Sequence, residues 1–316
     1  MNSLPRDYTG EMAGVATALL WTATSLLFSV AGRRIGPTAV NLTRLSFAIV
    51  LLAITHRAWS GNWVPDVGAR QVAFLAVSGA IGLAIGDQAL FHAFLDIGPR
   101  LSTLIMTTSP IFAASFGYMV LGESLGRLGL VGMVMTIGGV SWAVLERRPR
   151  PVAGAPSRTA RGVALALVGA VCQGGGLLLS KQGMGHGWLP AGERLDPQAA
   201  TLVRVVFAAL AMMPIVAIRH QLIRRRRSVP SPEPKRSDRI GYVLACCGAV
   251  AGPYLGVWMS LVAGDRAPIG VAQTLCSMTP IFILPAVAII HREPVSLRAV
   301  AGALVAVGGC AVLFVR

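Results

Sequence analysis

The feature that most constrains this chain is a series of ten apolar segments, each long enough to cross a lipid bilayer as a helix. A crossing helix needs about 20 mostly apolar residues, and these runs are continuous, without the alternation of membrane-barrel strands. Helices also satisfy every backbone polar group inside lipid. The sequence therefore predicts an all-α integral membrane protein with ten transmembrane helices, which begin near Met12, Thr38, Gln71, Arg100, Arg127, Arg161, Gln198, Arg239, Pro268 and Ser296.

Composition also places the chain in a membrane. Only 13% of its 316 residues are charged, against about 25% in a soluble domain, so polar groups could not cover a soluble surface. The net charge of +15 lies in the links between apolar segments, as in the cytoplasmic loops of membrane proteins. No basic helix with interleaved aromatic residues indicates nucleic-acid binding. We therefore expect a multi-pass protein of the cell membrane (plasma or inner), with the lipid bilayer as a partner and no nucleic acid.

The cysteines give no sign of a metal site. All five lie in apolar segments and none forms a C-x-x-C pair: Cys172, Cys246, Cys247, Cys276 and Cys310. Cysteines in such segments usually act as small apolar side chains. The sequence predicts no metal site, no disulfide framework and no cofactor.

One apolar, proline-centred motif occurs twice. The stretch TSPIF at residues 108–112 returns as MTPIF at residues 278–282, and each copy is followed at the same distance by a glutamate, Glu123 or Glu293. Other parts of the first half also return, including R-x-x-F-A at Arg44 and again at Arg204. The whole first half is therefore repeated in the second.

The repeat predicts the topology. Five helices are an odd number, so the second half must enter the membrane facing the opposite way, as in many secondary transporters. We expect a first five-helix repeat in residues 1–146, a basic linker in 147–160, and a second repeat in 161–316. Pro110 and Pro280 fall near mid-span, where each removes a backbone hydrogen bond and bends its helix; the bend serves either packing alone or gating. The repeated glycine pairs, Gly138-Gly139 and Gly308-Gly309, are expected to let helices approach closely.

At these residues the chain resembles the drug/metabolite transporter superfamily, in its EamA-like ten-span branch. The resemblance rests on Pro110, the LGE that ends in Glu123, and the glycines of the following span, together with their second copies; there HRE replaces LGE. Residues 85–105 are similar to the hairpin between the third and fourth spans of the family. The resemblance implies a transporter of metabolites or drugs, often coupled to a proton or to a counter-substrate, and does not name the cargo.

Three charged residues lie well inside the spans: Arg44, Asp87 and Arg204. An intramembrane charge costs at least about 2.5 kcal/mol on insertion scales and is a functional hypothesis by default. The two arginines either reach back to the interface or bind a carboxylate or phosphate of the substrate. Asp87, beside Gln88, is either a paired or water-exposed acid near the interface or part of a proton or cation relay with His92.

Polar and aromatic residues inside the spans are further candidates for contact with substrate. They are Trp21, Ser25, Gln173, Trp258 and Gln273. Glu123 and Glu293 lie at helix ends, where we expect each to cap a helix or to form an ion pair, such as Glu123 with Arg127 four residues later, and not to bind substrate.

The sequence thus favours a secondary transporter, an exporter or exchanger, for a small polar metabolite or drug. The alternative is a polytopic membrane enzyme of the acyl or glycosyl transferase type, for which His92 and Asp96 are the only acid/base pair found. A channel is disfavoured because the inverted repeat supplies two alternating gates.

The orientation in the membrane stays open. Lys and Arg gather in the loops on one side of the predicted bundle, including Arg33, Arg34 and the run Arg224–Arg227. The positive-inside rule then places both termini outside the cell, whereas the family resemblance implies that both lie inside. The sequence equally leaves open whether the chain is a monomer or a homodimer.

Overall fold

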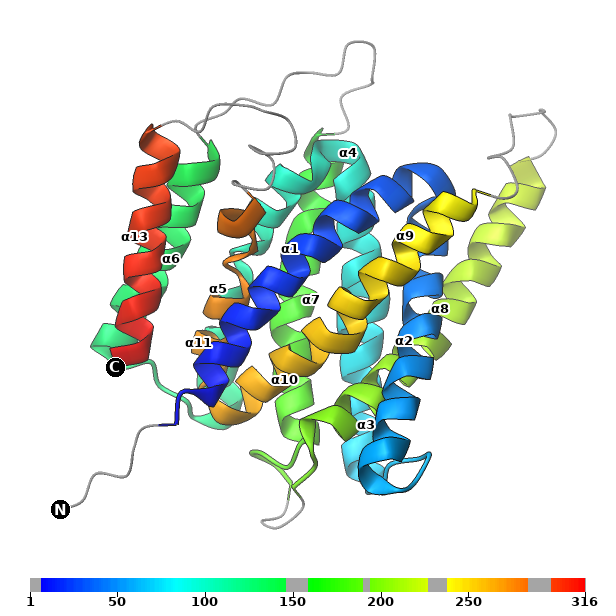
Figure 1. Ribbon diagram of the computed structural model, residues 1–316, viewed down its shortest axis with the longest axis horizontal. Coiled ribbons are helices and arrows are strands. Elements are labelled where there is room, and N and C mark those ends of the chain that lie inside the picture. Colours follow the sequence, from blue (N-terminus) through cyan, green and yellow to red (C-terminus); the bar gives the residue numbers. More distant parts are fainter. Residues whose placement is uncertain (1–6, 146–158, 190–193, 227–237, 284–296, 316) are drawn as a thin grey trace.

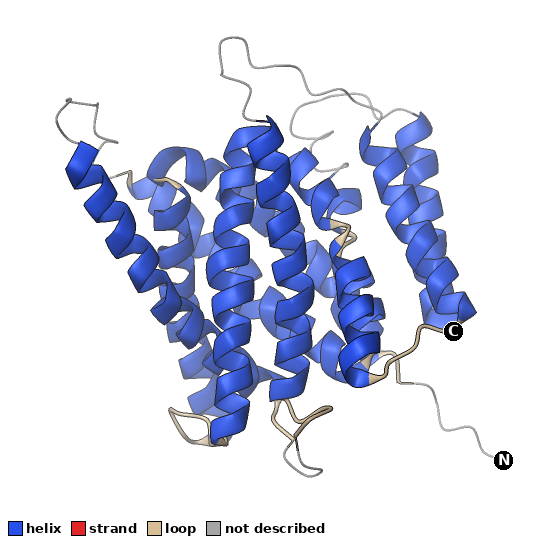
Figure 2. Ribbon diagram, turned by 180° about the vertical axis from the view of Figure 1, so that it is seen from behind, coloured by secondary structure: helices blue, strands red, loops and turns tan. Residues whose placement is uncertain are grey.

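A computed structural model describes residues 7–145, 159–189, 194–226, 238–283 and 297–315. In this part of the chain the regular structure is helical, with loops between the helices (Figure 2). The predicted all-α fold is confirmed. The basic linker expected at 147–160 lies almost wholly outside the described residues.

The first half begins with α1 (Thr9–Ile35) and α2 (Pro37–Ser60). A third long segment follows, in which α3 (Ala69–Ser78) runs through a π-helical stretch, η1 (Gly79–Gly86), into α4 (Asp87–Met106). The half ends with α5 (Ser109–Leu121) and α6 (Arg127–Leu145).

The second half repeats this order. It consists of α7 (Thr159–Gly183), α8 (Pro197–Arg226), α9 (Arg239–Ala249), η2 (Val250–Gly256), α10 (Val257–Arg266), α11 (Ile269–Cys276) and α13 (Leu297–Val315). A further helix begins at Thr279 and is described as far as Ile283. The sequence analysis assigned the arginine run Arg224–Arg227 to a loop, but α8 continues as a helix to Arg226.

Among the residues that the structure describes, seven helices are long and apolar enough to cross a membrane. They are Thr9–Ile35, Pro37–Ser60, Ala69–Pro99, Leu101–Leu121, Thr159–Gly183, Pro197–Ile218 and Arg239–Arg266. Three apolar helices are shorter: Arg127–Trp142, Ile269–Ile283 and Val300–Phe314. All ten begin within a few residues of the starts expected from hydropathy.

Two Gly-Pro pairs make the sharp turns between successive helices of the first half. Gly36 and Gly98 have φ near +80°, a conformation that only glycine adopts at little cost. The next residue, Pro37 or Pro99, starts a helix at a position where the missing N–H is not needed. Gly98 therefore separates the third span from the fourth inside the element labelled α4.

The two halves interlock. The first helix of each half packs on the third and fourth spans of the other: α1 contacts α9, η2, α10 and α11, while α7 contacts α3, η1, α4 and α5. The last helices of the halves, α6 and α13, lie side by side at one end of the molecule (Figure 1). Each half thus contacts the other through equivalent helices, as expected for two repeats related by internal symmetry.

Glycines allow α6 and α13 to pack closely. A Cβ atom at Gly139 would lie 2.6 Å from the carbonyl oxygen of Gly302, and one at Gly309 would lie 2.8 Å from that of Gly132. By contrast, a Cβ atom at Gly138 would meet nothing within 4 Å. The packing role expected for the glycine pairs is confirmed for one member of each pair.

Candidate functional site

The two copies of the proline motif mark breaks in two helices. The chain turns at residues 107–108 before α5 begins, and at 277–278 before the helix that starts at Thr279. Pro110 therefore lies in the first turn of α5, where its missing N–H costs nothing. The predicted bend is a full interruption, two residues ahead of the proline in each copy.

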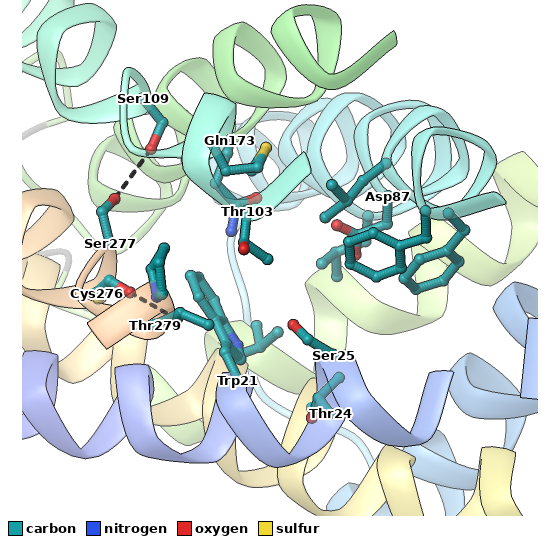
Figure 3. Close-up of a pocket in the computed structure, with 18 of the residues that line it drawn as sticks. Trp21, Thr24, Ser25, Asp87, Thr103, Ser109, Gln173, Cys276, Ser277 and Thr279 are labelled. Atoms are coloured by element: carbon teal, nitrogen blue, oxygen red, sulfur yellow. Dashed lines mark hydrogen bonds between the residues drawn. The ribbon is translucent and has the colours of Figure 1, made fainter. Parts of the chain in front are cut away.

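The breaks meet in the interior. Ser109 and Ser277, one from each break, have their hydroxyl oxygens 3.3 Å apart (Figure 3), and Gln273 Nε2 donates to Ser109 Oγ at 2.9 Å. Main-chain groups freed by a helix break are tolerated at membrane depth only within protein or beside a cavity. Such discontinuous helices form the substrate sites of many transporters.

A cavity lies at this junction. Its volume is about 80 Å³, which is smaller than the roughly 300–1,000 Å³ usual for small-molecule sites. Figure 3 shows Trp21 and Ser25 on α1 facing Thr103 and Gln173 across this space. The remaining wall residues are Thr24, Arg44, Leu83, Asp87, Leu90, Phe91, Phe94, Met106, Ser109, Gly252, Val257, Gln273, Cys276, Ser277, Thr279 and Pro280.

Two π-helical stretches lead into the cavity wall. η1 ends before Asp87 and η2 ends before Val257, and both of these residues line the cavity. The wider π turn shifts backbone hydrogen bonds and is frequent at functional sites. Here the carbonyl oxygen of Leu83 in η1 accepts from Arg44 Nη2 at 3.2 Å and from Asn41 Nδ2 at 3.3 Å.

Arg44 and Asp87 form an ion pair in the wall. Arg44 Nη2 lies 2.5 Å from Asp87 Oδ2, and the two side chains are 4% and 14% exposed. Arg44 Nε also donates to Asn41 at 2.9 Å, and the guanidinium lies 5.0 Å from the ring centre of Phe91. Arg44 therefore does not reach back to the membrane interface, because its partners hold it at the cavity.

Arg204 lies behind the wall. It is 2% exposed, and its guanidinium fits against two glycines: a Cβ atom would lie 2.7 Å from Nη2 at Gly82 and 3.1 Å from it at Gly176. Its Nε has no hydrogen-bond partner among the described residues. Asp87 lies within electrostatic range of Arg204 as well as of Arg44, so one carboxylate serves two buried cations.

The structure brings most of the candidate residues to one place. Seven of them line the cavity: Trp21, Ser25, Arg44, Asp87, Gln173, Gln273 and Pro280. Gln88, Pro110, Arg204 and Trp258 do not.

The candidates away from the wall have other partners. Gln88 donates to Thr38 Oγ1 at 2.8 Å. The ring of Trp258 packs edge-on against Trp59, 6.1 Å between centres.

Sequence reasoning did not select several polar wall residues. Thr103, Ser109, Ser277 and Thr279 all lie at or near the two breaks. The repeated proline motif could have indicated these residues, because the helix break beside it brings short hydroxyl side chains to the interior. The aromatic wall residues Phe91 and Phe94 carry no comparable signal in the sequence.

A second, largely buried ion pair joins the two repeats at the end of the molecule near the start of α1. Lys181 Nζ lies 2.5 Å from Glu123 Oε1 and donates to the carbonyl oxygen of Ala267 at 2.9 Å. Glu123 Oε2 accepts from the backbone N–H of Ile269 at 2.7 Å. These contacts, here called the Glu123 clasp, join α5 and α7 to the link between α10 and α11. The expected capping or pairing role of Glu123 is confirmed, since it accepts from the first N–H of α11, but its ion-pair partner is Lys181 and not Arg127.

The acid/base pair considered for an enzyme is not formed. His92 Nδ1 lies 2.7 Å from the backbone oxygen of Gln88, and Asp96 pairs with Arg161 at 3.0 Å. Among the described residues no group of three or more His, Cys, Asp or Glu could hold a metal ion.

Comparisons with known proteins agree with this arrangement. The model of the EamA-like transporter family matches residues 8–145 and again residues 160–315. A solved structure described as "Crystal structure of protein" aligns over 97% of this chain and 96% of its own, with a TM-score of 0.67 and 20% identity. At that identity the likeness shows the fold alone. Among curated proteins, none matches the chain.

Proposed function

The chain belongs to the EamA-like transporter family, and on that premise we propose that it is a secondary transporter, an exporter or exchanger of a small polar metabolite or drug. It is a multi-pass membrane protein, as its family and its apolar helices indicate. In this proposal ten transmembrane helices form two inverted repeats, in residues 1–146 and 161–316, in the cell membrane. The central cavity opens to one side and then to the other.

One observation supports this proposal most: the two broken helices, one from each repeat, meet at the cavity. Each break lies at the same position of its repeat, and Ser109 and Ser277 join them directly. A break allows the two parts of a helix to tilt separately, so each repeat can open its own side around a fixed centre. We assign substrate contact to Trp21, Arg44, Asp87, Gln173 and Gln273, which line that centre.

The Glu123 clasp supports alternation. It closes one end of the molecule with a buried ion pair that joins the two repeats. Lys181 corresponds to Arg33 in the first repeat, which is exposed, whereas Lys181 is buried. The two repeats therefore differ at this described position, as expected for one state of an alternating-access cycle; Glu293, the counterpart of Glu123, lies outside the described residues.

Efflux from proteoliposomes tests the function. The purified full chain is reconstituted, a defined panel of small metabolites and drugs is enclosed, and their appearance outside is followed by mass spectrometry. At least one solute should leave faster than from liposomes without protein. The matched control is Ser277→Trp, which fills the cavity and should abolish the difference. Equal efflux from wild-type and protein-free liposomes for every solute would contradict the proposal.

A further inference from the structure

The charges around the cavity do not balance. Among the described residues the wall carries one cation, Arg44, and one anion, Asp87. Arg204 adds a second buried cation within range of the same carboxylate. Buried charges are stable when each is paired and hydrogen-bonded, and intramembrane arginines mark substrate pathways or partners. The site therefore lacks one negative charge.

The N–H groups of the two buried arginines also outnumber the acceptors around them. Arg44 uses Nε for Asn41, and Nη2 for Leu83 and Asp87. Its Nη1 makes no hydrogen bond with a described residue and is not fully buried. Arg204 Nε is fully buried and also lacks an acceptor among the described residues. An arginine offers five donors in a planar fork that fits a carboxylate, so at Arg44 one edge of the fork is left for a ligand.

The other wall residues indicate what the uncharged part of an anionic ligand would contact. Trp21, Phe91 and Phe94 give the cavity an aromatic surface. Gln173 adds an amide that makes no hydrogen bond with a described residue. Small-molecule sites typically combine such an apolar lining with a few placed polar groups.

We propose that the cavity binds a small amphipathic organic anion, whose carboxylate accepts from Arg44 Nη1 in competition with Asp87. This inference rests on the proposed transport function and names the charge class of its substrate. Asp87 serves as the built-in competitor. It neutralises Arg44 when the cavity is empty, and it weakens the hold on the ligand enough for release, since an anion bound too tightly could not be transported.

Binding to the purified full chain in detergent tests this inference. The probes are three molecules of similar shape: phenylpropanoate, phenylpropanamide and phenylpropylammonium. The readouts are thermal stabilisation and the dissociation constant. Phenylpropanoate should stabilise the wild type, and the other two should not, because only a carboxylate supplies the missing charge.

The decisive variant is Asp87→Asn, which removes the competitor and retains the shape. It should melt at a lower temperature without ligand, because Arg44 loses its anion. It should bind phenylpropanoate on the order of tenfold more tightly than the wild type, which corresponds to about 1.4 kcal/mol, the low end of measured couplings between close charge pairs. Asp96→Asn is the matched control. Its carboxylate pairs with Arg161 away from the wall, so the dissociation constant should not change.

A second variant tests the role of Arg44 itself. Arg44→Lys retains the charge but loses the planar fork that lets one side chain hold Asp87 on one edge and a ligand carboxylate on another, so stabilisation by phenylpropanoate should fall well below that of the wild type.

Two results would overturn the inference. One is stabilisation by phenylpropylammonium that disappears in Asp87→Asn, which would make Asp87 the anchor of a cationic substrate. The other is no stabilisation of either wild type or Asp87→Asn by phenylpropanoate. The efflux experiment tests the proposed function separately. Transport of cations alone would support the transport function and contradict the anion site. Anion binding without any efflux would support the anion site and contradict the transport function.

Discussion

The Glu123 clasp offers the sharpest test of how the structure holds one end closed. The changes are Lys181→Met and Glu123→Gln, each alone and together. The two side chains are 6% and 22% exposed. Breaking a fully buried ion pair costs about 3–5 kcal/mol, and an exposed pair contributes at most about 1 kcal/mol. Because Glu123 is partly exposed, we expect about 2 kcal/mol of lost stability for Lys181→Met.

The double variant separates pairing from other effects. Glu123→Gln keeps an oxygen that can accept from the N–H of Ile269, so it removes mainly the charge. If the two side chains act as a pair, the double variant should be less destabilised than the sum of the single variants by about 1 kcal/mol or more. The free energies come from reversible unfolding of the detergent-solubilised protein by denaturing detergent.

The matched control is Arg33→Met, at the position of the first repeat that corresponds to Lys181. Arg33 is exposed, so its loss should change the free energy of unfolding by no more than about 0.5 kcal/mol. A coupling between Glu123 and Lys181 near zero, or an equal loss in the control, would refute the reasoning that this pair closes the end of the molecule.

The remaining predictions concern packing and a helix cap. Gly139→Ala should lower the melting temperature, because the added Cβ would lie 2.5 Å from the backbone nitrogen of Ala306; Gly138→Ala, in open space, should not, and an equal loss would exclude close packing as the cause. Asp238 caps α9 by accepting from the Gly241 N–H at 3.1 Å, and the hydrogen bond from Arg34 holds the pKa of its carboxyl below the usual value. Because the pKa of Asp238 is lowered in the folded state, its carboxylate stabilises the cap at pH values above the pKa of the unfolded chain. This stabilisation is lost as the pH falls through the folded-state pKa. Hydrogen exchange at Gly241, corrected for the intrinsic rate, should therefore show less protection at low pH, and Asp238→Ala should remove this dependence.

Much of the fold could be predicted because each membrane span is a continuous apolar segment that the sequence alone shows. The ten apolar segments begin close to their expected starts, and the repeat of the proline motif at 108–112 and 278–282 identified equivalent helices. The π-helical stretches η1 and η2 could not be predicted in this way. Their shifted hydrogen bonds depend on how Arg44, Asn41 and other helices pack against them, and no local propensity records this.

The candidate site was predicted in part. Buried charges stand out in an apolar segment, so Arg44 and Asp87 were found from their type alone. Their pairing was not, because 43 residues separate them and their contact depends on how α2 lies against α4. Trp258 shows the limit of residue type as a guide. It is an aromatic residue in a span, like Trp21, but its helix face turns it toward Trp59 and away from the cavity.

The most direct test of the central claim is whether the cavity is reached from both sides of the membrane. Ser277→Cys places a thiol in the wall of a chain whose five native cysteines are replaced by alanine. Ser78→Cys, fully buried beside Ser180, is the control. In uniformly oriented proteoliposomes a membrane-impermeant thiol reagent, applied outside or enclosed within, should label Ser277→Cys from either side and Ser78→Cys from neither. Labelling of Ser277→Cys from one side alone would mean a one-sided cleft and would contradict alternating access.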